Sequence, residues 1–246
     1  MYQFFVEPSQ IQGNQIVITG SDVNHIKNVL RMQIGEELSV SNGVDNREYR
    51  CGIEELGEDS IRCSLRFVKE DGLELSSRIY LFQGLPKADK MELIIQKAVE
   101  LGVYEVIPMA TKRAVVKLDE KKAKNKVLRW QGIAEAAAKQ SKRRIIPKVH
   151  EVMSIREAMD YAATMEVRLI PYELAEGMQE TKKIISSIVP GQDIAVFIGP
   201  EGGFDEAEIK DALAHQITPI TLGKRILRTE TAGFTVLALL MYHLES

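Results

Sequence analysis

Residues 193–204 read DIAVFIGPEGGF, and residues 205–213 continue as DEAEIKDAL. The apolar run from Ile194 to Ile198 predicts a buried strand. The glycines after it allow a sharp turn that side chains would block, and the next segment predicts a helix. A buried strand, a tight turn and a helix in succession are typical of an α/β domain with a mostly parallel sheet.

The same alternation extends on both sides of this stretch. Four further segments predict strands, namely RIYLFQG (78–84), VYEVIPM (103–109), VRLIPY (167–172) and ITPITL (217–222). Helices are expected over 88–102, over about 119–141, and from near Gln179, Asp205 and Thr229. Either Thr229 or Thr231 is expected to cap the last helix. This pattern predicts a sheet covered by helices on both faces.

The first 70 residues have a different character. Short stretches such as QIVITG, ELSVSNG and SIRCSLRFV alternate apolar and polar residues, as strands do. One helix is expected in VNHIKNVLRM (23–32), with Asp22 as its N-cap and Val29 on its apolar face. The pattern changes near EDGLELSS (70–77). We therefore expect a small β-barrel-like domain over residues 1–72 and an α/β domain over 73–246.

Composition excludes several classes of protein. The 246 residues are 45% hydrophobic and 27% charged, as in ordinary globular proteins. Cys51 and Cys63 are the two cysteines, so a disulfide scaffold is excluded and a zinc site is disfavoured. We expect both thiols to be reduced and half-buried. The N-terminus does not resemble a signal peptide, and GFTVLALLMYHL (233–244) is too short to span a bilayer. These features predict a cytoplasmic protein without membrane or metal.

Charge is distributed unevenly along the chain. The net charge is −3, but residues 112–148 hold 13 Lys and Arg against three acids. A block this basic is a candidate site for a polyanion such as RNA. The alternative is a solvated helix face, because lysine-rich helix surfaces are common.

Ligands of parallel α/β sheets bind beyond the carboxyl ends of the strands, and three such ends are unusual here. The glycines of IGPEGGF (198–204) could form a ligand cradle before a helix, or only a tight turn. TLGKRILRTETAGF (221–234) combines three cations with an apolar pair, which would suit the wall of a cofactor pocket. PYELAEG (171–177) carries Glu173, whose alternative is simple exposure to solvent. These residues do not define a reaction.

Six motifs together give the chain a specific resemblance: HIKNVLRM (25–32), LPKADKMELIIQKAVELGV (85–103), VVKLDEKKA (115–123), QSKRRIIP (140–147), IGPEGGF (198–204) and LGKRILRTETA (222–232). On these motifs the chain resembles the RsmE family of small-subunit ribosomal RNA methyltransferases. Members of that family methylate N3 of a uridine with S-adenosylmethionine, and they belong to the SPOUT, or α/β-knot, class. The resemblance covers nearly the whole chain.

The resemblance implies a C-terminal domain with a deep trefoil knot, an N-terminal PUA-like RNA-binding barrel and a homodimer. It implies 16S ribosomal RNA, within the small subunit, as the partner. It assigns ten residues to S-adenosylmethionine: Pro171, Glu173, Ile198, Gly199, Gly203, Leu222, Gly223, Ile226, Leu227 and Ala232.

Methylation of uridine N3 requires that N3 lose its proton. A nearby cation helps by stabilising the charge that is left on the ring oxygens. We expect Arg228 to be that cation, with Arg225 as second choice, and Glu230 or Glu173 to take the proton. RNA contacts are expected at His25, Arg31, Lys87, Lys121, Lys122 and Arg143. Two alternatives stay open, a non-catalytic RNA-binding protein and a methyltransferase acting on transfer RNA or on a ribose 2′-hydroxyl.

Overall fold

The computed structural model describes residues 1–70, 72–173, 175 and 177–245, which form two compact units. The first unit contains Met1–Glu74 and also Ala138–Ile146, and the second contains the remainder of the chain. The chain therefore leaves the second unit after Ala137 and returns to it at Pro147. The expectation of a single boundary near residue 72 did not include this excursion.

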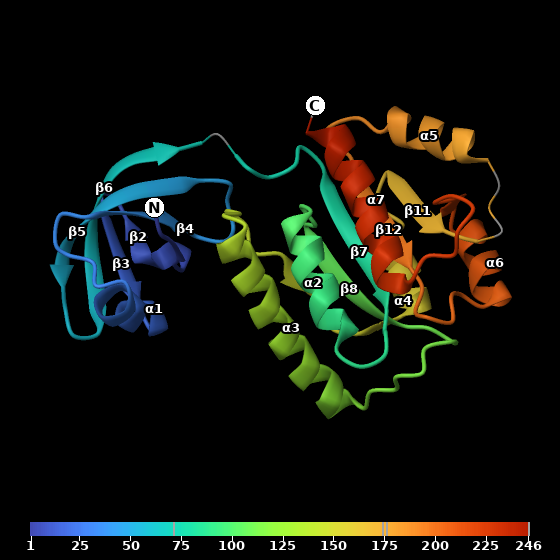
Figure 1. Cartoon of the computed structure of the whole chain (residues 1–246), viewed down its shortest axis with the longest axis horizontal. Helices are drawn as coiled ribbons and strands as arrows, with labels where there is room; N and C mark the ends of the chain where they lie inside the picture. Colours follow the sequence, from blue (N-terminus) through green and yellow to red (C-terminus); the bar gives the residue numbers. More distant parts are fainter. Residues whose placement is uncertain (71, 174, 176, 246) are drawn as a thin grey trace. The chain divides into compact units, whose positions relative to one another are not determined.

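The first unit is built on one six-stranded sheet with the strand order β1-β4-β5-β6-β3-β2 (Figure 1). Strand β1 pairs with β4 in parallel and the other pairs are antiparallel. Its strands are β1 (Gln3–Phe5), β2 (Ile11–Gln12), β3 (Gln15–Thr19), β4 (Glu37–Ser41), β5 (Glu48–Leu56) and β6 (Ser60–Lys69). A short helix, η1 (Pro8–Gln10), joins β1 to β2. The expected β-rich module is confirmed, but in the described residues β1 and β2 are the two edges of the sheet, so it forms a half-barrel and not a closed barrel.

The helix expected after β3 differs in detail from its prediction. It begins as α1 (Ser21–Asn24) and continues as a π-helical turn, η2 (His25–Val29). Its N-cap is Gly20, not Asp22, and Val29 is 60% exposed instead of facing the core. Val29 is the last residue of this wider π-helical turn, in which side chains advance less per residue around the axis than in an α-helix, so it does not reach the apolar face.

Both cysteines lie in the core of this first unit and are free. They are fully buried on β5 and β6, and not half-buried as expected. Hydrogen bonding to Cys63 and burial raise the pKa of the Cys51 thiol. The thiol therefore stays protonated and acts as a small apolar side chain.

The second unit has a seven-stranded sheet in which every pair is parallel. The order along the sheet is β10-β8-β7-β12-β11-β13, with β9 paired to β8. The strands are β7 (Arg78–Gly84), β8 (Glu105–Ala110), β9 (Lys148–Val149), β10 (Met153–Ser154), β11 (Val167–Pro171), β12 (Asp193–Ile198) and β13 (Thr218–Ile220). The prediction of a mostly parallel sheet is confirmed.

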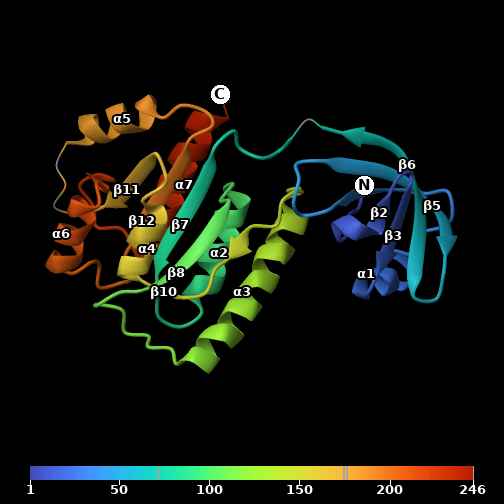
Figure 2. The ribbon, with the colours of Figure 1, turned by 180° about the vertical axis from the view of Figure 1, so that it is seen from behind.

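Helices cover both faces of this sheet, as Figures 1 and 2 show. On one face α4 and α6 pack over Phe82 and Phe197, whose rings stack with centroids 4.4 Å apart. The opposite face bears Gln83 and Ile198, against which α7 lies. The helices are α2 (Lys90–Glu100), α3 (Glu120–Gln140), α4 (Ile155–Ala162), α5 (Met178–Ser187), α6 (Glu206–Ala214) and α7 (Thr229–Leu244). In the described residues no helix is long and apolar enough to cross a membrane.

Candidate functional site

A cavity of about 510 Å³ lies where β11, β12 and β13 end. Three loops form it: the residues after β11, the glycine turn after β12 and the segment between β13 and α7. These are the three strand ends that the sequence marks as unusual. Because parallel strands present their carboxyl ends at one edge, segments about 30 residues apart in sequence meet here.

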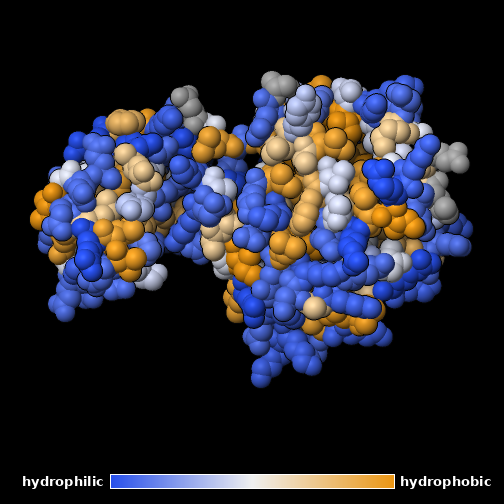
Figure 3. Space-filling view, in the orientation of Figure 1, coloured by the Kyte–Doolittle hydropathy of each residue, from blue (hydrophilic) through white to orange (hydrophobic). Residues whose placement is uncertain are grey.

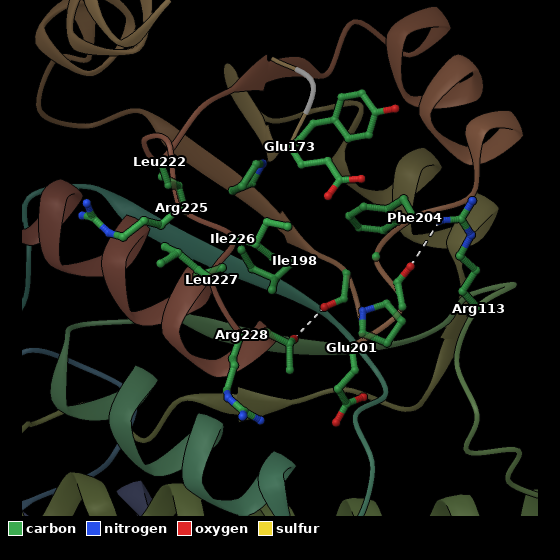
Figure 4. A pocket seen from close by; sticks show the side chains of 18 of the residues that line it. Arg113, Glu173, Ile198, Glu201, Phe204, Leu222, Arg225, Ile226, Leu227 and Arg228 are labelled. Atoms are coloured by element: carbon green, nitrogen blue, oxygen red, sulfur yellow. Dashed lines mark hydrogen bonds between the residues drawn. The ribbon is translucent and has the colours of Figure 1, made fainter. Parts of the chain in front are cut away.

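All ten residues that the resemblance assigns to the cofactor line this one cavity. Figure 4 shows Ile198 and Ile226 in the middle of the view, with Leu222 and Leu227 to one side of them. The wall is therefore apolar, while the glycine turn supplies backbone groups, and this combination is typical of a small-molecule site. Ile226 is 86% exposed, although it is apolar, which leaves it available to a ligand.

The glycine turn leaves room for a ligand at Gly203. This residue has φ +65°, and a Cβ added to it would meet no other atom within 4 Å. At Gly199 the opposite holds, because a Cβ there would lie 3.1 Å from the carbonyl carbon of Gly203. The turn is thus tightly packed at Gly199 and has free space beside Gly203. The backbone can therefore approach a molecule bound in the cavity closely.

Thr229 joins the two main loops of the cavity. Its hydroxyl donates to the Gly199 carbonyl at 2.6 Å and accepts from the side-chain amide of the fully buried Gln83 at 2.9 Å. The first of these bonds is drawn in Figure 4. The expectation that Thr229 or Thr231 caps α7 is wrong. The N-cap is Arg228, and its side chain makes no capping hydrogen bond. The Thr229 hydroxyl is used to hold the glycine turn instead.

The cations at the cavity point in different directions. Figure 4 shows the side chains of Arg225 and Arg228 directed away from one another, with Arg228 on the side of Glu201. Arg113 approaches from the opposite side and donates to the Gly202 carbonyl at 3.3 Å. Arg228 is exposed and lines the cavity, as its expected role requires.

Lys90 brings two carboxylates together at the cavity. Its ammonium lies 3.0 Å from Glu201 and 3.5 Å from Glu230. The hydrogen bond to Glu201 raises the pKa of Lys90. Burial would raise the pKa of Glu201, but backbone hydrogen bonds and Lys90 outweigh it and lower that pKa. Both groups are therefore charged at neutral pH.

The two expected proton acceptors are placed differently. Glu173 lines the cavity, whereas Glu230 is absent from its lining and faces Lys90. Sequence reasoning missed Lys90, Glu201, Arg113 and Phe204 as neighbours of the site. Lys90, Glu201 and Phe204 lie within motifs that carry the resemblance, and Arg113 lies two residues before another, so motif membership was the available signal. No group of three or more His, Cys, Asp or Glu side chains in the described ranges is arranged to hold a metal ion.

The expected RNA contacts divide into exposed and buried residues. His25, Arg31, Lys87, Lys121 and Lys122 are exposed. Arg143 is 5% exposed, and its guanidinium pairs with Glu74 inside the first unit. The placement of Arg143 corrects the expectation that it contacts RNA, because its charge is already matched by a buried carboxylate.

Comparison with known proteins identifies the family of this chain. The model described as RNA methyltransferase domain matches residues 73–241. The chain belongs to the RNA methyltransferase family. A second model of the family, the RNA methyltransferase PUA domain, matches residues 18–66 and so falls in the first unit.

The chain is also similar, over its full length, to proteins whose names specify ribosomal RNA of the small subunit. The ribosomal RNA small subunit methyltransferase E of Bacillus subtilis is 36% identical, covering 100% of this chain and 98% of that protein. The protein of the same name from Mesomycoplasma hyopneumoniae is 34% identical, covering 96% and 97%. Among solved structures, the family member from Neisseria gonorrhoeae, bound to S-adenosyl methionine, superposes with a TM-score of 0.85 at 28% identity, covering 98% and 97%.

Proposed function

We propose that this chain is an S-adenosylmethionine-dependent methyltransferase that modifies N3 of a uridine in 16S ribosomal RNA of the small subunit. The observation that carries the proposal is the single cavity lined by both glycine-containing loops and by all ten residues assigned to the cofactor. The family membership and the names of the full-length relatives support the reaction and the substrate.

The residues present fit the cofactor. The open space at Gly203 and the apolar wall of Leu222, Ile226 and Leu227 suit a nucleoside with an uncharged ring. S-adenosylmethionine, when bound, supplies an electrophilic methyl group on a positively charged sulfur. The chain itself must position the uridine, remove the N3 proton and stabilise the charge that spreads over the ring oxygens.

We assign the last of these tasks to Arg228, which lines the cavity. An arginine is cationic at any pH near neutrality, so it can stabilise an anion but cannot act as the base. Its exposed guanidinium is available to hold a uridine oxygen. Glu173, which lines the cavity, is the better-placed of the two proton acceptors, since Glu230 faces Lys90. N3 lies on the Watson–Crick edge, so the target base must be unpaired or extruded.

We also propose the knot, the dimer and the compartment that the resemblance implies. A threaded C-terminal segment is compatible with three loops converging on one cavity. Dimerisation through the second unit is supported by apolar side chains exposed on α2 and α7, namely Leu93, Leu239 and Tyr242; Figure 3 shows apolar residues along α7. A ribosomal RNA substrate places the protein in the bacterial cytoplasm. Leu239→Glu should halve the mass measured by analytical ultracentrifugation if α7 forms the interface.

The direct test of function compares ribosomal RNA from a strain with and without the gene. Mass mapping should show one uridine that loses a single base methyl group, and the purified protein should restore it with S-adenosylmethionine. Ribose methylation, or a lost methyl group in transfer RNA, would identify one of the alternatives instead. An unchanged RNA with intact binding would mean that the protein binds RNA without modifying it.

A further inference from the structure

A second cavity, of about 710 Å³, lies in the second unit beside the start of α3. The loop after β8, the first turns of α3 and the residues around β10 enclose it. Its volume falls within the range of small-molecule sites, roughly 300–1,000 Å³. None of its lining residues takes part in the cofactor cavity: Leu85, Ala110, Thr111, Lys112, Ala114, Val116, Lys117, Leu118, Glu120, Ala123, Lys124, Val127, Glu151, Val152, Met153 and Ser154.

The walls of this cavity combine apolar side chains with one unsatisfied hydroxyl. Val116, Leu118, Val127 and Met153 supply apolar surface on several sides. Thr111 is 8% exposed, and its Oγ1 has no hydrogen-bond partner among the described residues. A buried hydroxyl without a partner is costly, so it marks a place where a ligand can supply the missing bond.

Cations surround the opening. Lys112, Lys117 and Lys124 line the cavity together with Glu120 and Glu151, and residues 112–126 contain seven Lys and Arg against two acids. Lys112 pairs with Asp205 and Lys124 with Glu120, but these lysine side chains are largely exposed, so the pairs are weak and leave the ammonium groups open to phosphates. Figure 3 shows hydrophilic side chains over this end of α3, with apolar residues among them. Apolar walls for a flat ring, a hydrogen-bonding group and a cationic rim for phosphates together match a nucleotide within an RNA strand.

The two cavities are adjacent along the chain. Lys112 lines the second cavity and Arg113, the next residue, lines the first. Both cavities therefore border the same loop. The backbone amide of Lys112 donates to the Glu208 carboxylate at 2.7 Å, and its ammonium donates to the Asp205 carboxylate at 2.9 Å, so both carboxylates fix this loop. A strand whose target base enters the first cavity would carry neighbouring nucleotides past this loop.

We propose that the second cavity binds a nucleobase of the RNA substrate close to the target uridine. This inference rests on the proposed function, because the target uridine defines where the neighbouring base lies. The base stacks against the apolar wall and hydrogen-bonds to Thr111, while the rim lysines contact the flanking phosphates. The cavity thus contributes to the choice of uridine without touching the cofactor.

The test fills the cavity and compares a matched control on the same helix. Ala123 lines the cavity, whereas Ala136 is an exposed residue of α3 outside it. Ala123→Phe should raise the KM for small subunits that lack the methyl group by about tenfold. A change of this size corresponds to the loss of one moderately strong base-stacking contact. Ala136→Phe should leave KM unchanged, and neither variant should alter S-adenosylmethionine affinity measured by calorimetry.

A second variant removes the hydroxyl with little change in shape. Thr111→Val should raise KM about fivefold, the effect of one lost hydrogen bond, while the variant stays folded. Equal KM values for Ala123→Phe, Thr111→Val and the wild type would overturn the proposal.

Crosslinking separates this proposal from the proposed function. A photoreactive benzophenone residue at Val116, which lines the cavity, should crosslink to a short segment of 16S RNA that includes the methylated uridine. Crosslinks only to ribosomal proteins, or to RNA far from that uridine, would overturn the nucleobase site. Crosslinking of the Val116 variant to 16S RNA, together with a wild-type protein that methylates no RNA, would instead overturn the proposed function.

Discussion

Arg228 occupies the N-cap position of α7, yet its side chain makes no capping bond. Glu230, the acid two positions along the chain, faces Lys90. The backbone of Arg228 is extended, with φ −65° and ψ 156°, a conformation that any residue can adopt at an N-cap. The guanidinium is therefore dispensable for the fold, which makes it a clean target for mutation.

We expect Arg228→Ala to lose roughly 100-fold in single-turnover methylation, the usual effect of removing one electrostatic stabiliser. Arg228→Lys should recover part of the rate, because it keeps the charge but not the planar fork. Calorimetry should show unchanged cofactor affinity for both. Arg156→Ala, at an exposed position of α4 outside the cavity, is the control and should keep full activity. Parallel loss of folding and rate in Arg228→Ala would make the residue structural.

Gly223 allows a test of the cofactor loop. Its φ is +110°, and a Cβ there would touch only the terminal methyl of Met178, at 3.6 Å. Gly223→Val should abolish cofactor binding because a branched residue forces the loop out of its conformation. Gly191 has a similar φ, +95°, but lies in a turn away from the cavity. Calorimetry should therefore show normal binding by Gly191→Val, and loss in both variants would point to general destabilisation.

The sequence predicted the residues of the cofactor cavity better than their roles. Glycines and apolar residues at strand ends form a local pattern, so Gly199 and Leu227 could be found from their motifs. Arg143 could not be separated from the exposed cations around it, because its partner Glu74 lies 69 positions away. Thr229 looked like a cap because the sequence cannot reveal that the Gly199 carbonyl lies beside it.

At the scale of elements, α3 carries the exposed part of the basic block. Lys121 and Lys122 lie in its first turn and are exposed, and Lys122 pairs with the nearby Asp119, at 3.0 Å. The buried arginines of the block, Arg143 and Arg144, follow α3 and belong to the first unit. The expected polyanion site is thus smaller than the block of 13 cations suggested.

Replacing both Lys121 and Lys122 with Gln should weaken RNA binding and flatten its salt dependence. Each phosphate contact contributes a slope of about 0.7–0.9 in log K against log salt, so a fall of roughly 1.5 is expected. The matched control replaces Lys182 and Lys183 on α5 with Gln. Lys183 forms an ion pair with Glu180, three positions away, just as Lys122 does with Asp119. An unchanged slope in the α3 variant would identify its lysines as a solvated face.

Elements were predicted well where hydrophobic periodicity was long and regular. Strands β7 and β12 and helix α2 follow their patterns, since burial on both faces of a strand leaves a continuous apolar run. The segment 21–29 was predicted less well, because a change from α-helix to π-helix leaves no mark in a short amphipathic pattern. Thus Val29 was placed on the wrong face.

At the scale of the whole molecule, the segment 138–146 is held by two buried arginines. The guanidinium of Arg144, 2% exposed, contacts Glu48 at 3.0 Å and the carbonyls of Asn46 and Lys69 at 3.1 and 3.2 Å. Burial would raise the pKa of Glu48, but a hydrogen bond from Ser39 and the charges of Arg50 and Arg144 outweigh it and lower that pKa.

Arg144→Met should destabilise the first unit by about 3 kcal/mol, because it removes the contacts of a buried guanidinium with Glu48 and with the carbonyls of Asn46 and Lys69, while Arg50 remains paired with Glu48. The pKa of Glu48 is lower in the folded state than in the unfolded chain. Its ion pairs therefore stabilise the folded state at pH values above the unfolded-state pKa, and this stabilisation is lost as the pH falls through the folded-state pKa. The loss on acidification should therefore be smaller in the variant. Hydrogen exchange of β4 and β5 measures both effects. Lys142→Met, an exposed neighbour, should match the wild type.

The excursion of the chain through the first unit also governs how the protein is made. Synthesis runs from the N-terminus, so all six strands of the first unit are complete once residue 69 has been added. Glu74 nevertheless lacks its arginine partner, and Glu48 lacks one of its two, until residues 143 and 144 leave the ribosome. Residues 75–137 of the second unit, which include β7, α2, β8 and most of α3, must therefore emerge before the first unit can be finished. The two units are consequently obliged to mature together, and a nascent chain released before residue 143 would carry an N-terminal sheet that lacks the arginine partner of Glu74 and one of the two arginines that pair with Glu48.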